Sequence, residues 1–570
     1  MMPNSFLIAV GAPLNLPGQS PTYQNQGVEL YTRHLNPRFI QANVTNGFRL
    51  FIGECHNSQG QTEDSQLQPA GTHIHFSEAS LSLEIKCDHL GTAIVYWRQD
   101  RHRVLVSNRK ENLATPDDAI DWPSIQQYLH TGFTVNSATF YKSIYQTEPG
   151  TRLAIESQPN PSVSTGRIST SLAVTNQQTD QLLEQVINRL SQKLASSPAS
   201  VIMMSAGWDS RTLLLNGAQN LAGAYTHGDL SSREIELARK LTGLQRLDHL
   251  FVDVRHSPIT VELIEHMLEE LGSAVFPIWF LASQNIQQWK NAPMMSGVLG
   301  ELLGGHYGLM SWGSRAHKLS ASLLLLNKRL ISEDQVRKGI ERYCTPPASH
   351  WFVSAAGQAM LDTHRNETRQ RVTNAIEEDY RSCGDWQQAL ENFNMGHRAR
   401  QYILKQAHAA SGSIGYTLPF ADPTLVELTR CLPFSERIHN RANRYMLKAR
   451  KPDLLNESLA ATLVPARYPI LLQELSRGLR IAREALSQMR GKQKPRLGWF
   501  NYDHLYEERL LHELTDTLKA DIWDKNKMHE AVDANPAKGI DAGSTLDMIC
   551  KIKTVDHYLT QPGTMRGLQP

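Results

Sequence analysis

A chain of 570 residues is too long for one average domain, so we expect two or three domains. Its net charge of +2, from 58 basic and 56 acidic residues, argues against a nucleic-acid or membrane partner. Six widely separated cysteines without a C-x-x-C pair exclude a zinc ribbon and a disulfide scaffold, which favours a reducing, cytoplasmic location.

Residues 1–155 are predicted to form a β-rich domain. Short apolar runs separated by turn residues are typical of strands. The candidate strands are Phe6–Val10, Phe48–Gly53, Ser80–Lys86, Thr92–Arg98 and Arg103–Ser107. A helix is predicted from Asp121 to His130, with Asp121 as its N-cap and Pro123 in its first turn.

The polar segment 156–176 contains prolines, serines and a glycine, so it is predicted to link two domains. The second predicted domain, 177–570, opens with an amphipathic helix at Thr179–Leu194. Strands then alternate with helices, which predicts a parallel sheet covered on both faces. The expected strands are Val201–Met204, Ala222–Thr226 and His249–Val254, and the expected helices include Ser231–Leu241, Thr260–Leu271, His317–Lys328, Pro423–Cys431 and Ile470–Met489.

The stretch from Val201 to Leu215 predicts a ligand site. Four apolar residues are followed by the small and polar residues 205–210 and then by a second apolar run. A turn between a buried strand and a helix directs backbone N–H groups at one point, which suits a phosphate. Asp209 can hold Mg²⁺ bound to that phosphate. The alternative is an ordinary corner in which Asp209 only stabilises the start of the helix.

The residues from Ser205 to Ser210, S-A-G-W-D-S, resemble the S-G-G-x-D-S pyrophosphate loop of the ATP pyrophosphatase superfamily, with Ala206 in place of the first glycine. Three later stretches resemble its asparagine-synthetase-type members in the same order. Residues 225–239 are similar to the second strand and helix, 296–307 to the second glycine-rich loop, and 398–422 to the R-x-P-F-L-D stretch. The resemblance implies a C-terminal α/β ATP pyrophosphatase domain with a parallel sheet and added helices.

The N-terminal part resembles the glutaminase domain of the same family. Residues 88–96 are similar to its D-x-x-G-x-x-P-L-Y region, without the proline, and 121–150 to its end. The resemblance implies an Ntn-hydrolase-like sandwich and a two-domain chain of α/β and α+β class. Working family glutaminases expose a cysteine once Met1 is removed, whereas the first cysteine here is Cys55. An internal cysteine has no free amine as its base, so we expect a degenerate glutaminase.

Family members with a disabled glutaminase include β-lactam synthetases and lasso peptide cyclases, which form an amide within one substrate. The resemblance therefore implies an AMP-forming, ATP-dependent carboxylate–amine ligase that adenylates a carboxylate for attack by an amine. A lasso peptide macrolactam, as in antibiotic biosynthesis, is the expected product, and a precursor peptide and its leader protease are the expected partners. The alternatives are a ligase acting on a small molecule or free ammonia, and an inactive nucleotide-binding scaffold.

The resemblance also implies ATP and Mg²⁺ as cofactors and assigns them residues. Asp209 and Glu301 would bridge Mg²⁺ to the pyrophosphate, and Glu301 stands where the family usually has an aspartate. A solvated surface acid is the alternative for Glu301. The implied nucleotide contacts are Met203 and Tyr225 beside the adenine, Ser205, Gly207 and Ser210 around the phosphates, and Gly297, for which a plain tight turn is the alternative.

Two positions depart from the family pattern. Val298 stands where the family often has an acid or a tyrosine that positions or deprotonates the amine. The family lysine that stabilises acyl transfer has no counterpart in residues 460–468, where Arg467 is the cation that can replace it. The expected catalytic residues are therefore Asp209, Glu301 and Arg467, with a surface arginine as the alternative for the last. His306 and His408 are candidates for deprotonating the amine.

Overall fold

The structure, a computed structural model, describes residues 1–560 except residues 15, 17, 36–38, 45, 56–68, 158–159, 169–177, 231, 254–255, 257–258, 290–291, 309–332, 412–413, 490–503 and 539. The helix predicted at His317–Lys328 and part of the predicted linker lie outside this description. The described chain is mixed α/β, with two antiparallel sheets, one parallel sheet and many helices.

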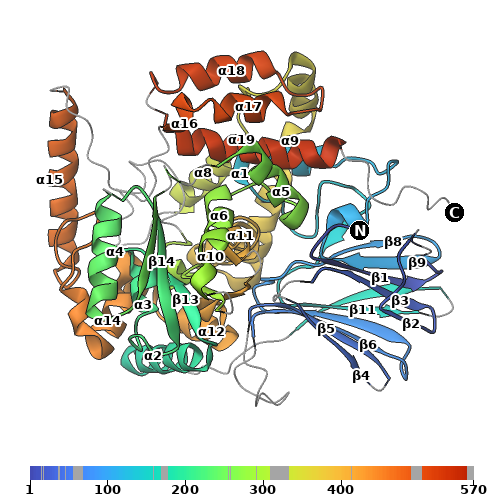
Figure 1. Cartoon of the computed structure of the whole chain (residues 1–570), viewed down its shortest axis with the longest axis horizontal. Helices are drawn as coiled ribbons and strands as arrows, with labels where there is room; N and C mark the ends of the chain where they lie inside the picture. Colours follow the sequence, from blue (N-terminus) through green and yellow to red (C-terminus); the bar gives the residue numbers. More distant parts are fainter. Residues whose placement is uncertain are drawn as a thin grey trace.

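Two antiparallel six-stranded sheets form a sandwich from the N-terminal part of the described chain (Figure 1). Their strands are β1 (Ser5–Gly11), β2 (Tyr23–Asn25), β3 (Val28–Arg33), β4 (Phe39–Val44), β5 (Gly47–Gly53), β6 (Gly71–Ser77), β7 (Ser82–Cys87), β8 (Tyr96–Gln99), β9 (Arg103–Ser107), β10 (Tyr145–Gln146), β11 (Thr151–Glu156) and β12 (Ser162–Arg167). The strand orders are β10-β8-β9-β1-β3-β2 and β12-β11-β7-β6-β5-β4. The expectation of a β-rich N-terminal part is confirmed.

Alternating side chains of β1 belong to two different cores. Phe6, Ile8 and Val10 pack between the two sheets of the sandwich. Leu7 and Ala9 point the other way and pack against helices of the C-terminal part. All five are at most 1% exposed. A strand buried on both faces reads as a continuous apolar run, which is why its position was predictable.

Part of the predicted linker is a strand instead. β12 pairs with β11 in antiparallel register, from Thr151 opposite Arg167 to Glu156 opposite Ser162. β12 is the edge strand of its sheet, and most of its side chains are exposed. Exposed edge strands carry polar residues, so their composition is close to that of a linker. The interpretation of residues 162–167 as a linker is therefore wrong.

The second half of the chain contains a sheet of five parallel strands. They are β13 (Ser200–Met203), β14 (Leu221–Gly228), β15 (His249–Asp253), β16 (Met294–Met295) and β17 (Tyr416–Thr417). The order is β15-β14-β13-β16-β17, so the chain moves outward from β13 and then returns to its other side at β16. Ligands in such sheets bind outside the carboxyl ends of the strands where this reversal occurs.

Helices cover both faces of the parallel sheet, as predicted. Val201 and Met203 of β13 belong to one core and Ile202 belongs to the other. The Ile202 face is covered by α2 (Thr179–Ser196), α3 (Trp208–Thr212), α4 (Arg233–Leu244), α12 (Pro423–Cys431) and α14 (Arg441–Arg450), and the other face by α5 (Val261–Leu271), α6 (Pro277–Asn285) and α11 (Lys405–Ser411).

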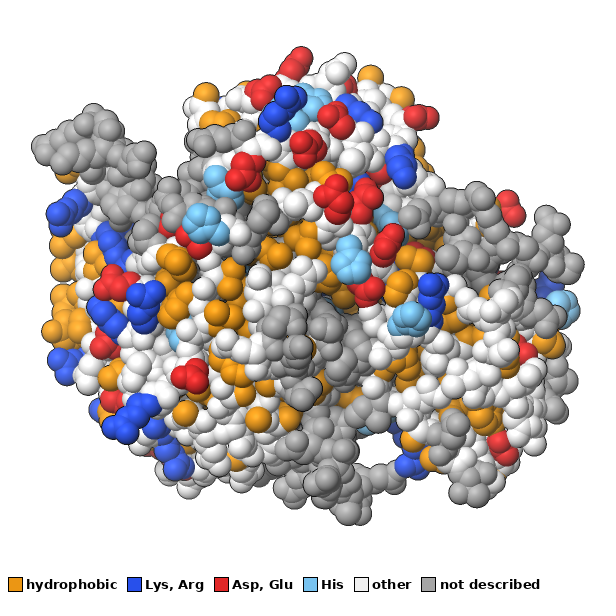
Figure 2. All heavy atoms as spheres, viewed as in Figure 1, with side chains coloured by type: hydrophobic (Ala, Val, Ile, Leu, Met, Phe, Trp, Pro, Cys, Tyr) orange, Lys and Arg blue, Asp and Glu red, His pale blue; other side chains and the backbone are white. Residues whose placement is uncertain are grey.

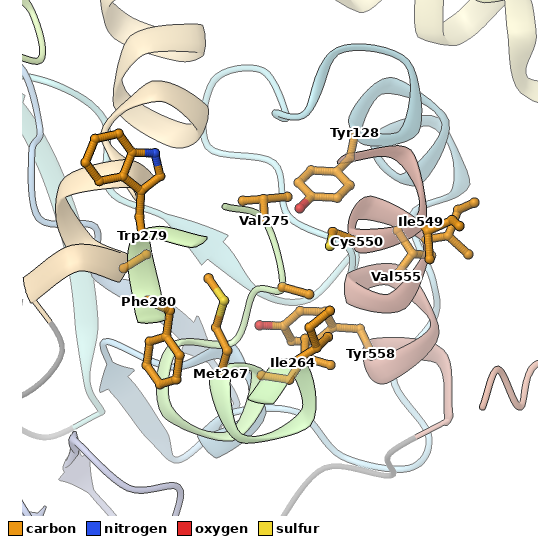
Figure 3. Packing of buried hydrophobic residues seen from close by; sticks show 14 of the residues in the cluster. Tyr128, Ile264, Met267, Val275, Trp279, Phe280, Ile549, Cys550, Val555 and Tyr558 are labelled. Carbon is orange, nitrogen blue, oxygen red and sulfur yellow. The ribbon is translucent and has the colours of Figure 1, made fainter. Parts of the chain in front are cut away.

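The remaining named helices are α1 (Trp122–Thr131), α8 (Glu333–Cys344), α9 (Ala355–Cys383), α10 (Trp386–Phe393), α15 (Ile470–Met489), α16 (His504–Glu507), α17 (Leu510–Asp516), α18 (Lys525–Ala534) and α19 (Ala542–Thr560). In Figure 3, Tyr558 of α19 points toward Ile264 and Met267 of α5, and Tyr128 of α1 lies beside Cys550 of α19. The core that includes these residues therefore joins the sandwich, the parallel sheet and the C-terminal helices. None of the described helices is long and apolar enough to cross a membrane.

The helix α15 exposes an apolar face. Leu471, Leu475 and Leu479 are 60–73% exposed, and apolar side chains follow the edge where α15 lies (Figure 2). Apolar surface of this extent on a helix is typical of a contact with another macromolecule.

Candidate active site

The loop after β13 is closed by its own hydroxyl groups. Ser205 Oγ and Ser210 Oγ lie 2.8 Å apart, and Ser210 Oγ also donates to the carbonyl oxygen of Ser205 at 2.9 Å. The N–H of Gly207 donates to Ser205 Oγ at 3.0 Å. These bonds fold residues 205–210 into a compact turn at the carboxyl end of the central strand. The three predicted phosphate-binding residues therefore lie together, at the strand end where the sheet topology predicts a ligand.

A carboxylate already contacts this turn. The N–H of Ala206 donates to Glu234 Oε1, on the first turn of α4, at 2.8 Å. Backbone N–H groups of such turns bind carboxylate and phosphate oxygens alike, because both are anionic acceptors. The Glu234 carboxylate therefore accepts from a backbone N–H, that of Ala206, for which a bound phosphate would compete. Sequence reasoning did not identify this residue, which was assigned only to a family-like helix.

The glycine-rich loop after β16 packs directly against the first loop. A Cβ atom at Gly300 would lie 2.7 Å from Asp209 Cγ, and one at Gly297 would lie 3.3 Å from Asp209 Cβ. The N–H of Gly300 donates to the carbonyl oxygen of Gly297 at 3.1 Å, and Leu299 between them has φ of 77°. Gly297 therefore begins a tight turn. Its missing side chain also lets the second loop approach Asp209 closely.

The two predicted metal ligands form a partly buried carboxylate pair. Burial and the negative charge of Glu301 raise the pKa of Asp209 well above its usual range. The Tyr307 hydroxyl donates to Glu301 Oε2 at 2.9 Å. Burial and the same carboxylate raise the pKa of Tyr307 far above that of a free phenol, so Tyr307 remains a donor. Tyr307 thus fixes Glu301 beside Asp209.

These residues fit Mg²⁺ bound together with a polyphosphate. Mg²⁺ usually takes one or two protein carboxylates and completes its shell with water and substrate phosphates. Asp209 and Glu301 supply the two carboxylates, and their mutual repulsion is what a divalent cation would remove. Within the described ranges, no group of three or more His, Cys, Asp and Glu side chains is placed to hold a metal ion.

Met203 and Tyr225 are neighbours on adjacent strands. They are partners in the register of β13 and β14, and both are buried in the same core. The Tyr225 ring lies 5.6 Å from His227, which lies 4.4 Å from the ring of Trp279. The structure thus brings the two predicted adenine neighbours together on one face of the sheet. Their contact with a base stays a prediction.

Arg211 connects the turn of residues 205–210, called here the phosphate-type turn, to a distant segment. Its guanidinium, which is fully buried, donates to the carbonyl oxygens of Leu454, Glu457 and Ser458 at 2.9–3.0 Å and of Ala206 at 3.2 Å. Ala206 and Leu237 also pack against Ala460. Sequence reasoning missed Arg211, although a cation before the buried run 213–215 was the available signal.

Arg467 is bonded to the segment that Arg211 holds, but it is exposed to solvent. Its Nη1 donates to Asn456 Oδ1 at 2.9 Å, and its backbone N–H donates to the carbonyl oxygen of Leu455 at 3.0 Å. In the part of the chain that the structure describes, Arg467 makes no contact with Asp209 or Glu301. The structure does not bring Arg467 together with the other predicted site residues, and its catalytic role stays a prediction.

Two histidines with lowered pKa values lie near the second loop. The backbone N–H of His306 donates to the carbonyl oxygen of Glu301 at 3.0 Å. In its side chain, Nε2 lies 3.1 Å from Asn440 Nδ2. Burial and the charge of Arg477 lower the pKa of His306. Burial, His306 and neighbouring arginines lower the pKa of His439 to about 4. Both imidazoles are therefore neutral near pH 7.

Comparisons with known proteins add little to this geometry. No protein-family model matches the sequence. No curated protein matches it either. Among solved structures, the chain is similar to the glutamine phosphoribosylpyrophosphate amidotransferase from B. subtilis complexed with ADP and GMP, with 11% identity and a TM-score of 0.17. The match covers 44% of this chain and 60% of that chain, and a TM-score this low does not establish a shared fold.

Gly300→Ala is expected to weaken Mg²⁺–ATP binding. The new methyl group would overlap the Asp209 carboxyl group, and overpacking of this kind costs about 1–3 kcal/mol, or roughly ten- to hundredfold in affinity. Calorimetric titration with Mg²⁺–ATP measures the change. Gly243→Ala on α4 is the matched control, because a Cβ atom there meets nothing within 4 Å. Wild-type affinity in Gly300→Ala would show that the loop contact does not position Asp209.

Asp209→Asn is expected to raise the melting temperature at pH 8, and to raise it less at pH 5. The raised pKa means that the folded protein holds this proton more tightly than the unfolded chain, whose aspartate has a pKa of about 3.9. Stability therefore falls as the pH rises from that value toward the folded pKa, and asparagine removes this loss. Thermal unfolding without added metal measures it. A variant less stable than wild type at pH 8 contradicts the carboxylate repulsion.

Glu234→Gln is expected to tighten ATP binding by roughly fivefold, because a hydrogen bond to a charged acceptor is worth about 1 kcal/mol more than one to a neutral acceptor. The weaker competitor would release the Ala206 N–H more readily. Equilibrium binding of ATP in the presence of Mg²⁺ measures the effect. The control is Glu236→Gln, an exposed position on the same helix that pairs with Lys240. Weaker binding in Glu234→Gln would mean that Glu234 supports the loop instead of competing for it.

Proposed function

We propose that this protein is an ATP-dependent carboxylate–amine ligase that adenylates a carboxylate and releases pyrophosphate and AMP. One observation supports the proposal above all. Two loops, at the carboxyl ends of adjacent strands and at the reversal of strand order, place Asp209 and Glu301 together beside a phosphate-type turn. This combination suits a metal-bound polyphosphate.

Each residue has a role in the proposed reaction. Bound Mg²⁺–ATP supplies the electrophilic phosphorus that activates the carboxylate. Asp209 and Glu301 would hold the cation, and the turn that Ser205 and Ser210 close would cradle the phosphates. Arg211 holds residues 454–458 over the turn.

His306 is the proposed acceptor of the proton from the attacking amine. Its imidazole is neutral near pH 7, and its backbone is bonded to that of Glu301. Val298, at the position where the family often has an acid or a tyrosine, is buried and has no group that accepts a proton. His306, in the neighbouring part of the same loop, can replace that group as the base.

The proposed substrate is a peptide whose amine and side-chain carboxylate join as a macrolactam. The support for this substrate is the sequence resemblance to cyclising members of the family. The exposed apolar face of α15 also fits a protein or peptide partner. Mass spectrometry of the product distinguishes this macrolactam from an amide formed with a small molecule or with free ammonia.

A nucleotide-binding scaffold is the second candidate. The observations that favour it are Ala206 and Val298 at positions that depart from the family pattern, and the carboxylate of Glu234 on the turn. A scaffold would bind ATP without releasing pyrophosphate.

Incubation with ATP, Mg²⁺ and a peptide encoded beside this gene tests the proposal. We expect pyrophosphate release and a product lighter than the peptide by one water. Asp209→Ala is expected to abolish release, because the cation loses a ligand, whereas Glu236→Ala at an exposed position keeps it. Binding of ATP without release with any carboxylate tested would favour the scaffold. Release at the wild-type rate by Asp209→Ala would overturn the metal assignment.

A further inference from the structure

A cavity of about 110 Å³ lies between the sandwich and the helices of the C-terminal part. Its wall combines Lys110, which follows β9, with Gly272 after α5, Lys405 of α11, Tyr416 of β17 and Tyr558 of α19. None of the residues assigned to the ATP site lines it. A cavity of this volume has room for several water molecules or one small solute.

Two lysine ammonium groups belong to this cavity. Lys110 Nζ lies 4.2 Å from the ring centres of Phe140 and Tyr558, and Lys405 Nζ lies 5.9 Å from that of Tyr128. Among the contacts of the described residues, neither ammonium group pairs with a carboxylate. Aromatic faces attract a cation but carry no net charge, so they do not neutralise either lysine.

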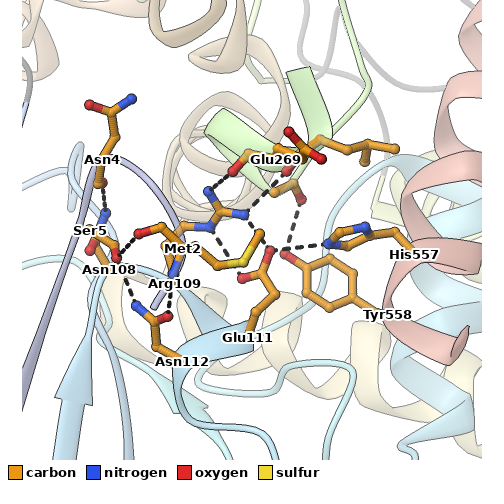
Figure 4. A network of polar contacts seen from close by, with 12 residues as sticks. Met2, Asn4, Ser5, Asn108, Arg109, Glu111, Asn112, Glu269, His557 and Tyr558 are labelled. Atoms are coloured by element: carbon orange, nitrogen blue, oxygen red, sulfur yellow. Dashed lines mark hydrogen bonds and ion pairs between the residues drawn. The ribbon is translucent and has the colours of Figure 1, made fainter. Parts of the chain in front are cut away.

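The carboxylates near the lysines already have partners. Glu111 pairs with Arg109 through bonds of 2.6 and 3.2 Å, and His557 Nε2 lies 3.4 Å from it (Figure 4). Glu270 also lines the cavity, and the Asn4 side chain that donates to it is neutral, so the negative charge of Glu270 remains. The two ammonium groups of Lys110 and Lys405 still exceed this single carboxylate by one charge.

A third cation increases this excess. Arg400 lines the same cavity, and its guanidinium donates to the carbonyl oxygens of Gly91, at 2.8 Å, and Thr147. Carbonyl oxygens satisfy the donors of a guanidinium without cancelling its charge. Arg109 differs, because Glu111 neutralises it.

We propose that this cavity binds a small oxyanion, of phosphate or carboxylate chemistry, between the ammonium groups of Lys110 and Lys405. An anion would provide the charge partner that both lysines lack and would remove the repulsion between them. Phosphate has five heavy atoms and fits the volume.

The lysine protonation states agree with this arrangement. Burial lowers the pKa of Lys110 to about 8. Burial and the charge of Lys110 lower the pKa of Lys405 to about 7. With a pKa of about 7, Lys405 is charged in about half of the molecules at pH 7, and a bound anion would favour the ammonium form of both lysines.

Thermal unfolding of the full chain with increasing inorganic phosphate tests the proposal. Chloride keeps the ionic strength constant, and acetate replaces phosphate in a second series. We expect a saturable rise in melting temperature, as for any ligand that binds only the folded state. A rise with phosphate alone, acetate alone or both identifies the preferred oxyanion. If neither anion raises the melting temperature, the proposal is wrong.

Lys110→Met and Lys405→Met locate the binding. Each is expected to reduce anion affinity roughly ten- to hundredfold, the effect of losing one charged hydrogen bond. Lys142→Met, at an exposed position, should bind like wild type. Without anion, both cavity variants should melt above the wild type, because methionine removes a buried charge at similar length. This second measurement shows that they fold.

The Ser205→Ala variant tests whether phosphate binds at the phosphate-type turn instead of in the cavity. If phosphate stabilises the two cavity variants as it does the wild type, but not Ser205→Ala, the anion binds at the turn and the cavity proposal is overturned. The expected result is the opposite, with stabilisation kept in Ser205→Ala and lost in the lysine variants. The proposed ligase function does not enter either outcome.

Discussion

The repulsion between the carboxylates of Asp209 and Glu301 is the interaction on which the arrangement of the site depends. Packing brings them together against that repulsion, because Gly297 and Gly300 leave no side chain between the two loops. Tyr307 holds Glu301 through a hydrogen bond, and partial burial weakens the screening of the pair by water. The fold therefore stores unfavourable electrostatic energy at one point, and binding a divalent cation there would release it.

The rest of the C-terminal part positions those two loops. The strands β13 and β16 are adjacent and parallel, so both loops leave the sheet at the same edge. Behind them, Arg189 of α2 makes a bidentate pair with Asp422, at 2.7 and 2.8 Å. Asp422 also caps α12 by accepting from the N–H of Leu425. One buried carboxylate thus fixes two helices on the same face of the sheet, which explains the value of an aspartate at that position.

The sequence predicted the elements that carry a regular apolar pattern. The strand β9 and the helices α12 and α15 have the predicted bounds, because their apolar residues are periodic and their ends carry turn residues. The two-residue strands β16 and β17 have no period, so only the family resemblance indicated the second loop. Arg211 was missed for another reason. Its partners are backbone carbonyl oxygens up to 247 residues away, and a backbone partner leaves no trace in residue types.

β17 is the element shared by the candidate active site and the lysine cavity. Tyr416 lines the cavity, and the carbonyl oxygen of the next residue, Thr417, accepts from the N–H of Ser296 at 3.1 Å. Ser296 begins the loop that carries Gly297 and Glu301. β17 and β16 are paired along their length, and the bond from Ser296 to Thr417 extends this pairing to the loop of the carboxylate pair, so β17 provides a direct connection between the two sites.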